Sequence, residues 1–383
     1  MRILILHSRY RSGPASGENR VVEDELRLLS DGGHEVEVFA PSVGDPSAAE
    51  LIRTGIRVVW SRKASLEVHR RIKRLRPDVV HCHNLFPSLS PSVVREIPER
   101  IALVMTLHNY RLHCLPGILL RDGRICEDCL GRAPWPGVLH GCYQGSVAAS
   151  LPLASSLALH RKLRTFERVD LFLAISEFVR AKNIEGGLPA ERVIVKPHFV
   201  WPSEEREGPG DYFLFLGRLS PEKGVGTLLD AWKDLGTRLV IVGDGPEAAS
   251  LRARASHHVE FLSTVPPERA RALVRSARAM VVPSLAYEGA GRVVLEGYAA
   301  GVPALGSEIG GLPEVIEDGV TGLLLAPGDA AAWRHGVGRL LDDSESRRMG
   351  GESIRLWREK YSPRTGLALL EHAYQAARSR SQR

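Results

Sequence analysis

The stretch AMVVPSLAYEGAGRVVLEGYAAGVPALGS, residues 279–307, decides the fold. It begins with a short apolar run, AMVVPS, continues through a polar loop into a segment with helical spacing, and ends in a second apolar run, PALGS. Apolar runs of this length without polar alternation are typical of strands buried on both faces. This order of strand, helix and strand therefore predicts one unit of a parallel sheet that helices cover.

The same pattern recurs in two series along the 383 residues. The predicted strands are RILILH, EVEVFA, RVVW, DVVHCH, LVMTLH, LFLAIS and VIVKPHF, then YFLFLG, RLVIVG, VEFL, AMVVPS, PALGS and GLLLAP. A polar segment with two prolines and two glycines separates the series and reads as a linker. We expect an α/β fold of two Rossmann-like, doubly wound domains facing a central cleft. Their predicted bounds are 1–200 and 211–360, with the linker at 201–210 and an amphipathic helix at 361–383 that could cross back to the first domain.

The composition is that of a globular protein with a modest basic excess, 51 basic against 45 acidic residues and a net charge of +6. This excess fits phosphate-bearing substrates, and no aromatic residues interleave with the basic cluster as nucleic-acid binding would favour. The cluster, Arg70 to Arg76, predicts a basic helix that either contacts an anionic membrane peripherally or is a solvated face. The first apolar run is too short for a signal peptide, and no run approaches the ~20 residues that span a bilayer. We expect a cytoplasmic protein; if the basic helix contacts a membrane, the inner membrane face is the site expected for it.

Two cations follow the first predicted strand of the second domain. Arg218 and Lys223 lie in GRLSPEKG, a turn bounded by glycines between a strand and a helix. Arginine presents a planar fork to paired phosphate oxygens and lysine a compact charge, so the turn predicts a clamp for a diphosphate. A solvated basic turn is the alternative.

Two carboxylates lie eight residues apart in the decisive stretch. Glu288 stands in the loop after a strand, and Glu296 stands on the helix that we expect to begin near Ala290. Their oxygens can accept hydrogen bonds from sugar and ribose hydroxyls, although such a pair can equally be surface helix charges. Gly310 and Gly311 then precede another helix, whose free backbone N–H groups could hold an anion.

Taken in order, GRLSPEKG, VIVGDGPE and EGAGRVVLEGYAAGVPALGSEIGGLPEVIEDGVTGLLL resemble the retaining family four glycosyltransferases. The match is close over about residues 212–330 and looser before them. The resemblance implies a GT-B fold and a nucleotide-diphosphate sugar donor. It assigns Arg218 and Lys223 to the donor diphosphate, Glu288 to donor-sugar hydroxyls and Glu296 to the ribose. Gly289-Ala290 departs from the larger pair common in the family and leaves the identity of the sugar open.

In the first domain, His108 ends a predicted strand and faces the expected cleft. The resemblance places such a histidine beside the reacting sugar. We therefore name His108 and Glu288 as the catalytic pair, with His108 bonding the donor sugar or shaping the acceptor pocket. It is not expected to be a covalent nucleophile, and a structural histidine is the alternative.

The segment Gly13 to Asn19 reads as a flexible loop after the first strand. Its glycines do not have the spacing of a dinucleotide-binding turn, which argues against a nicotinamide enzyme. Gly17, Glu18 and Asn19 are candidates for contact with the acceptor. Ser176 is a weaker candidate, since a serine before Glu177 can simply cap a helix.

Four cysteines, Cys114, Cys126, Cys129 and Cys142, fall within a loop-like insertion at 111–145. Four thiolates can complete a tetrahedral zinc site, and Cys126 and Cys129 have chelating spacing. A structural zinc site and a set of free cysteines are both open. We expect Cys82, in contrast, to be a buried strand residue.

The prediction for function is transfer of a sugar from a nucleoside-diphosphate sugar to a hydroxyl acceptor, with retained configuration. The acceptor class is open among glycolipids, polysaccharide precursors and secondary metabolites. No carboxylate clamp for a metal is visible, so no cofactor is expected for the chemistry. A nucleotide-sugar epimerase of the same fold and a non-catalytic nucleotide-sugar binding protein are the rival hypotheses.

Overall fold

A computed structural model describes residues 1–9, 17–42 and 48–382. The chain divides into two compact units. The first unit holds Met1–Leu119, Cys126–Lys196 and Leu367–Arg383, and the second holds Leu120–Ile125 and Pro197–Gly366. The boundaries between the main parts of the two units therefore fall directly after Lys196 and directly after Gly366.

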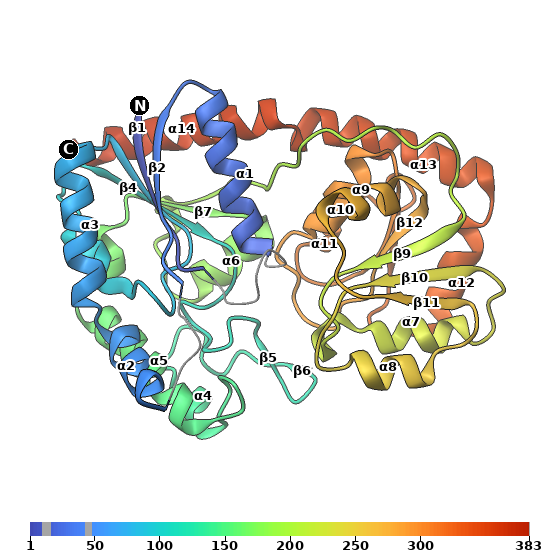
Figure 1. The fold of residues 1–383 in the computed structure, drawn as a ribbon, viewed down its shortest axis with the longest axis horizontal. Coiled ribbons are helices and arrows are strands. Elements are labelled where there is room, and N and C mark those ends of the chain that lie inside the picture. The colour runs from blue at the N-terminus through green and yellow to red at the C-terminus, as the bar shows by residue number, and fades with distance from the viewer. Residues whose placement is uncertain (10–16, 43–47, 383) are drawn as a thin grey trace. The chain divides into compact units, whose positions relative to one another are not determined.

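The first unit contains a six-stranded parallel sheet in the order β2-β1-β3-β4-β7-β8 (Figure 1). Its strands are β1 (Arg2–Leu6), β2 (Glu35–Phe39), β3 (Val79–Cys82), β4 (Ala102–Leu107), β7 (Leu171–Ala174) and β8 (Val193–Val195). The strand order reverses between β1 and β3. In open α/β sheets such a switch point, at the carboxyl ends of the strands, is where ligands bind.

The helices of the first unit begin where the sequence offers caps. They are α1 (Gly17–Asp31), α2 (Ala48–Val59), α3 (Arg62–Leu75), α4 (Trp135–Leu139), α5 (Val147–Lys162) and α6 (Glu177–Glu185), with most of α14 (Pro363–Ser381). Ser61 caps α3, and Ser176 caps α6 by accepting a hydrogen bond from the Val179 N–H at 3.2 Å. Ser176 is thus a helix cap, as its alternative interpretation held.

One strand prediction in this unit is wrong. The run RVVW, residues 57–60, forms the end of α2 instead of a strand. Periodicity cannot separate a short apolar run in a strand from one in a helix. Here the carbonyls of Val58 and Val59 accept hydrogen bonds from Ser156 and His160 of α5, so packing against α5 favours the helix.

The C-terminal helix α14 carries a buried stripe within the first unit. Leu370, Ala373, Tyr374 and Ala377 are all fully buried, which is the spacing of one helix face. His34 bonds Glu371 at 2.9 Å, and the Tyr374 hydroxyl bonds His81 of β3 at 2.9 Å. Residues 367–382 are therefore an integral part of this unit.

The second unit has a parallel sheet in the order β11-β10-β9-β12-β13-β14 (Figure 1). Its strands are β9 (Tyr212–Leu216), β10 (Arg238–Val242), β11 (Val259–Leu262), β12 (Ala277–Val282), β13 (Ala304–Ser307) and β14 (Gly322–Leu325). Its helices are α7 (Val225–Trp232), α8 (Ala248–Arg254), α9 (Pro267–Arg275), α10 (Arg292–Ala299), α11 (Leu312–Val315), α12 (Ala330–Leu340) and α13 (Asp343–Leu356). The strand order reverses between β9 and β12.

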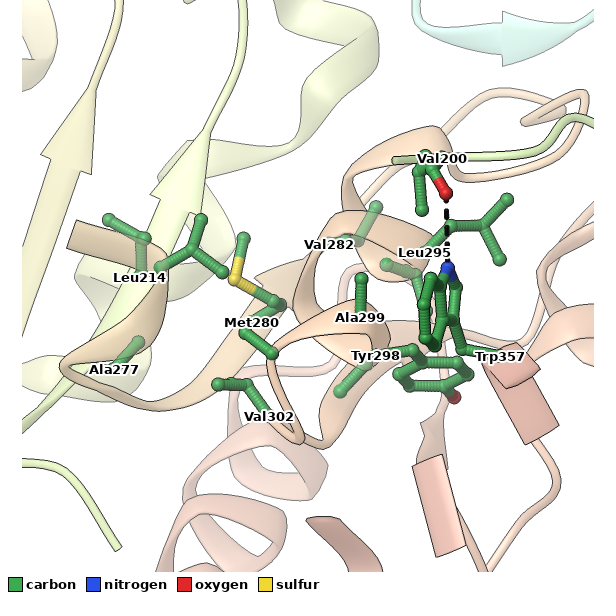
Figure 2. Packing of buried hydrophobic residues seen from close by; sticks show 14 of the residues in the cluster. Val200, Leu214, Ala277, Met280, Val282, Leu295, Tyr298, Ala299, Val302 and Trp357 are labelled. Atoms are coloured by element: carbon green, nitrogen blue, oxygen red, sulfur yellow. Dashed lines mark hydrogen bonds between the residues drawn. The ribbon is translucent and has the colours of Figure 1, made fainter. Parts of the chain in front are cut away.

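Alternate side chains of these strands enter two separate cores. Leu214 and Met280 pack with α9, α10 and α11 on one face of the sheet (Figure 2). Their neighbours Phe213 and Ala279 pack with α7, α8 and α12 on the other face. Because successive side chains of a strand point to opposite faces, continuous apolar runs are what a sheet covered on both sides requires.

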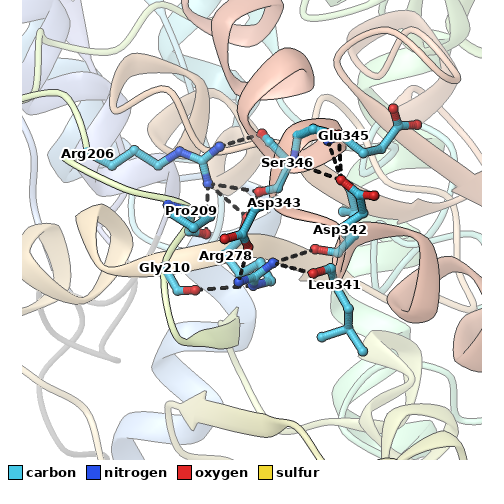
Figure 3. Close-up of polar contacts among 11 residues, drawn as sticks. Arg206, Pro209, Gly210, Arg278, Leu341, Asp342, Asp343, Glu345 and Ser346 are labelled. Carbon is cyan, nitrogen blue, oxygen red and sulfur yellow. Dashed lines mark hydrogen bonds and ion pairs between the residues drawn. The ribbon is translucent and has the colours of Figure 1, made fainter.

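The segment 201–210 has no helix or strand and belongs to the second unit. Its Arg206 guanidinium donates to the carbonyls of Pro209 and Arg278, each at 3.1 Å, and to Ser346 of α13 (Figure 3). Burial, with neighbouring Arg278 and Arg347, lowers the pKa of Arg206 to about 10. Arg206 thus fixes the predicted linker to the body of the unit.

The basic cluster lies on α3 and just after it, as predicted, and much of it is neutralised. Arg71 and Arg74 both pair with Glu37 of β2, and Arg71 also pairs with Glu67. Arg70 lies 3.7 Å from Glu67. Among the described residues, no helix is both long enough and apolar enough to span a membrane.

Candidate functional site

In the second unit, an ion pair joins the two strands at the switch point of the sheet. Lys223 follows β9 in a short 3₁₀ turn, and Glu288 lies in the loop after β12. The Lys223 Nζ atom lies 2.5 Å from Glu288 Oε1, and both side chains retain some exposure, 33% and 17%. The resemblance had assigned Lys223 to the diphosphate and Glu288 to the sugar of one donor, and the structure brings the two residues together.

Both members of this pair are held in their charged forms. Burial alone would raise the pKa of Glu288, but the Lys223 ammonium and hydrogen bonds from Lys223 and Ser284 lower it. Burial likewise opposes the charge of Lys223, but its attraction to Glu288 raises its pKa. The pair therefore offers a fixed cation and a fixed carboxylate side by side at a ligand-binding edge.

Ser284 is a member of this site that the sequence did not reveal. Its hydroxyl donates to Glu288 Oε1 at 2.5 Å, so it orients the same oxygen that Lys223 contacts. A polar residue at the carboxyl end of a predicted strand was the available signal, because such residues line the binding edge of a parallel sheet.

The two glycines hold the Glu288 loop by close backbone contact. Gly310 has a φ of 63°, and a Cβ there would lie 2.5 Å from the Glu288 carbonyl oxygen. The Gly311 N–H donates to the same carbonyl at 2.7 Å. The Gly311 N–H is thus engaged with Glu288, and the helix that follows, α11, has only four residues; binding of a diphosphate at Gly310 and Gly311 stays a prediction.

Arg218 is exposed at the end of β9, on the turn that also carries Lys223. Two glycines beyond β10 allow this turn to pack closely. A Cβ at Gly243 would lie 1.9 Å from the Gly217 carbonyl oxygen, and one at Gly245 would lie 2.2 Å from that of Leu219. The glycines of the motif VIVGDGPE are thus explained by backbone packing against the basic turn.

Glu296 lies on α10, which begins at Arg292, two residues later than predicted, after Gly291 with a φ of 53°. Arg292, which the sequence reasoning missed, donates to Glu296 Oε1 at 3.2 Å across one helical turn. The spacing of four residues was the signal that could have revealed the pair. Glu296 is 34% exposed, so its carboxylate remains accessible beside the arginine.

In the first unit, His108 lines a small pocket at the carboxyl ends of β3 and β4. His83, Glu18, Asn109 and Arg111 are among its other lining residues. The His108 Nε2 atom lies 2.9 Å from His83 Nδ1, and the two rings are stacked. Burial and neighbouring cationic or imidazole groups lower the pKa of His108 well below its usual value, so the ring is neutral at pH 7.

The acceptor-side candidates lie on α1 instead of in a loop, which corrects the prediction for Gly17 to Asn19. Gly13 lies outside the described residues. Glu18 accepts a hydrogen bond from Asn109 at 2.5 Å on the pocket wall. Asn19 is 7% exposed and bonds His7 at 2.8 Å, so it belongs to the buried interior beside the pocket.

The four cysteines of the insertion form no disulfide and lie near one another. Among the described residues, the one group of three or more metal-type ligand atoms within 4.8 Å of one another is Glu25, His81 and His83. The cysteine sulfurs are thus not gathered into coordination geometry. Cys82 is fully buried in β3 as expected, and burial raises its pKa to about 12.

Comparison with known proteins accounts for both units. A family model described as "Glycosyltransferase Family 4" matches residues 15–204, and one described as "Glycosyl transferases group 1" matches residues 201–357. The chain is 35% identical to the D-inositol 3-phosphate glycosyltransferase of Nocardia farcinica over 390 residues, which cover 90% of this chain and 81% of that protein. It is 28% identical to the glycogen synthase of Mycobacterium tuberculosis over 391 residues, which cover 90% and 86%.

Two solved structures share the fold at low sequence identity. The sucrose-phosphate synthase of Thermosynechococcus elongatus superposes with a TM-score of 0.69 at 18% identity, covering 98% of each chain. The Anabaena protein HepE, in complex with UDP and glucose, gives 0.65 at 18% identity, covering 98% of this chain and 99% of that one. The chain therefore belongs to the group 1 and family 4 glycosyltransferases, and it is a glycosyltransferase with a GT-B fold.

Proposed function

We propose that this enzyme transfers a sugar from a nucleoside-diphosphate sugar to a hydroxyl acceptor with retention of configuration. The observation that carries the proposal is the Lys223–Glu288 ion pair at the switch point of the second sheet. A cation for the diphosphate and a carboxylate for the sugar hydroxyls stand together there, with exposed Arg218 on the same turn. The complex of HepE with UDP and glucose supports a donor of this class.

In the proposed reaction, the bond between the anomeric carbon and the diphosphate oxygen breaks and a bond to the acceptor oxygen forms. The acceptor's proton leaves with the nucleoside diphosphate. Negative charge that grows on the leaving diphosphate would be stabilised by Lys223 and Arg218, which is where an enzyme gains most from fixed charges. Glu288, held by Lys223 and Ser284, would orient the sugar, and no divalent metal is invoked.

The first test is a thermal-shift panel of UDP-, GDP- and ADP-linked sugars, followed by transfer assays with the stabilising donor. Release of nucleoside diphosphate that depends on a hydroxyl acceptor, with a product of the donor's anomeric configuration by NMR, would support the proposal. Conversion of the donor to its epimer without acceptor would favour the epimerase, and binding without nucleotide release would favour the binding protein. An inverted product would overturn retention alone.

Zinc binding by the four cysteines is a separate proposal. Backbone N–H groups of Gly117, Ile118 and Leu119 donate to the Cys114 sulfur, and that of Gly137 donates to Cys129. These hydrogen bonds favour the thiolate form that binds zinc, but burial outweighs them and raises the pKa of both thiols, that of Cys129 to about 11. Binding would require the sulfurs to move closer together than they are in the present structure.

Peripheral contact with an anionic membrane also remains a prediction. The pairing of Arg70, Arg71 and Arg74 with Glu37 and Glu67 leaves less of the basic cluster available to lipid head groups than the sequence suggested.

A further inference from the structure

A cluster of buried polar residues adjoins His108 in the first unit, and its member His83 contacts the His108 ring. Glu25 of α1, His81 of β3 and Lys196, the residue after β8, have at most 2% exposure, and His83 has 5%. Burying charged and titratable groups is costly unless they are paired, so such a cluster calls for a structural or functional reason. None of these residues was assigned a role in binding either substrate.

The charges of the cluster compensate each other. The Lys196 ammonium contacts Glu25 Oε1 in a buried ion pair. The second carboxylate oxygen, Oε2, lies 3.4 Å from His83 Nε2 and 3.8 Å from His81 Nδ1. Glu25 therefore turns one oxygen to a lysine and the other to two imidazoles.

A divalent cation does not fit this group, although its ligand types would allow one. Lys196 already supplies the positive charge beside Glu25. The nitrogens of His81 bond the Tyr374 and Thr106 hydroxyls at 2.9 and 2.8 Å. A metal would have to displace these partners and tolerate an adjacent ammonium, so the group is a hydrogen-bond network.

The network determines which nitrogen of His83 carries the proton. The ring of His83 is neutral, because burial and nearby His81, His108, His7 and Lys196 lower its pKa well below the usual value. Its Nε2 and the Glu25 Oε2 have no well-aligned partner among the described residues, and they face each other at 3.4 Å. Two buried lone pairs would repel at this distance, whereas an N–H facing a carboxylate is attractive. This contact favours the tautomer of His83 that carries its proton on Nε2.

The tautomer of His83 then dictates that of His108. With its proton on Nε2, His83 has a lone pair on Nδ1, 2.9 Å from His108 Nε2. A hydrogen bond at this distance requires the proton to lie on His108 Nε2. Since His108 is also neutral, its Nδ1 can only accept a hydrogen bond, and any group that meets it must be a donor.

We propose that Glu25 and His83 are positioning residues that hold His108 as the Nε2–H tautomer, so that His108 accepts a hydrogen bond from a substrate hydroxyl. The inference rests on the proposed function for its substrate, but the tautomer itself does not. Orientation of a functional imidazole through the hydrogen bond of its other nitrogen is a general device in enzymes. Here the orienting carboxylate acts through a second histidine and is paired with a buried lysine.

The test uses the full chain labelled with ¹⁵N-histidine, with long-range ¹H–¹⁵N correlation spectra that distinguish the two neutral tautomers. The His108 signals are assigned by their loss in His108→Asn. In the wild type we expect His108 and His83 both as Nε2–H tautomers at pH 7. An Nδ1–H or protonated His108 would overturn the proposal, whether or not any sugar transfer is detected.

Two variants then test the chain of causes. In Glu25→Gln with Lys196→Met, which removes both buried charges together, the preference of His108 for Nε2–H should weaken and kcat should fall about tenfold, the worth of one ordered hydrogen bond. His83→Phe keeps an aromatic ring and should have the same effect on kcat. An unchanged tautomer in a folded double variant would overturn the role of Glu25. Wild-type spectra as expected with no transfer from any nucleotide sugar would refute the proposed function and leave the tautomer assignment standing.

Discussion

Lys223 Nζ and Glu288 Oε1 lie 2.5 Å apart and connect the turn after β9 with the loop after β12. These are the two strands between which the order of the second sheet reverses. The pair thus marks the place where parallel sheets bind ligands, and it keeps a cation and a carboxylate ready before a donor arrives. A bound diphosphate would share the Lys223 ammonium with Glu288, and exposed Arg218 on the same turn offers it a second cation.

Replacing Lys223 with Met should lower kcat/KM for sugar transfer by about 10²–10³-fold, the usual cost of removing one group that stabilises charge in the transition state. Glu288→Gln should cause a similar loss, because the sugar loses its charged acceptor. Lys233→Met is the matched control, since that exposed lysine pairs only across one helical turn. Steady-state kinetics measure these losses. A kcat/KM of either site variant within threefold of the wild type would contradict the assignment of Lys223 and Glu288 to the donor site.

Gly310→Ala should impair transfer more than it impairs folding. The substitution strains a backbone with positive φ and drives a Cβ into the Glu288 backbone. Displacing Glu288 by about 1 Å could cost up to about 100-fold in rate. Gly319→Ala is the control, because Gly319 has a similar φ of 71° with nothing within 4 Å of a new Cβ. Equal kinetics for the two variants, measured alongside their melting temperatures, would show that Gly310 does not hold the site.

The protein should lose stability as the pH falls from about 6.5 towards 4. Burial, with nearby Arg161, lowers the pKa of His113 to about 4 despite its bond to Asn183. Between pH 6.5 and pH 4 the His113 imidazole is protonated in the unfolded chain but neutral in the folded chain. Acid therefore favours unfolding. His113 alone contributes at most about 3 kcal/mol to this loss.

Denaturant unfolding at pH 7 and pH 5 measures this loss of stability. His113→Gln should weaken the dependence on pH, and His335→Gln, at an exposed position, should leave it unchanged. An unaltered pH dependence in His113→Gln would assign the effect to other groups.

Elemental analysis of protein purified without added metal checks the zinc proposal. We expect a single zinc ion per chain, lost in Cys126→Ser and retained in Cys82→Ala, because Cys82 is buried in β3 away from the insertion. Binding by four thiolates would also make the melting temperature sensitive to a strong chelator. Absence of zinc from the wild type would leave the four cysteines as free thiols.

The strands of the second unit were predictable from the sequence because a sheet covered on both faces demands unbroken apolar runs, as Phe213 to Phe215 illustrate. The strand predicted at RVVW, residues 57–60, was wrong because the helix that packs against this run cannot be inferred from a short stretch of sequence. The start of α6 could be placed because Ser176 caps it, whereas α10 begins later than predicted, after Gly291, where no side chain caps the helix.

For the site, Lys223 and Glu288 could be named because each follows a strand at the binding edge. Their contact with each other could not, because it joins residues 65 positions apart. The same holds for Glu25 and His83, whose roles arise only when α1 and β3 meet in the folded unit. Roles that depend on hydrogen bonds between residues far apart in the chain therefore cannot be predicted from local sequence patterns.

The place of α14 in the first unit has a consequence for biosynthesis. A ribosome synthesises residues 367–382 only after it has synthesised all of the second unit. Until then the first sheet lacks the fully buried Leu370, Ala373 and Tyr374, so its nascent form exposes an apolar seam and leaves His81 without the Tyr374 hydroxyl. The first unit therefore stays incomplete until every residue of the second unit has been synthesised.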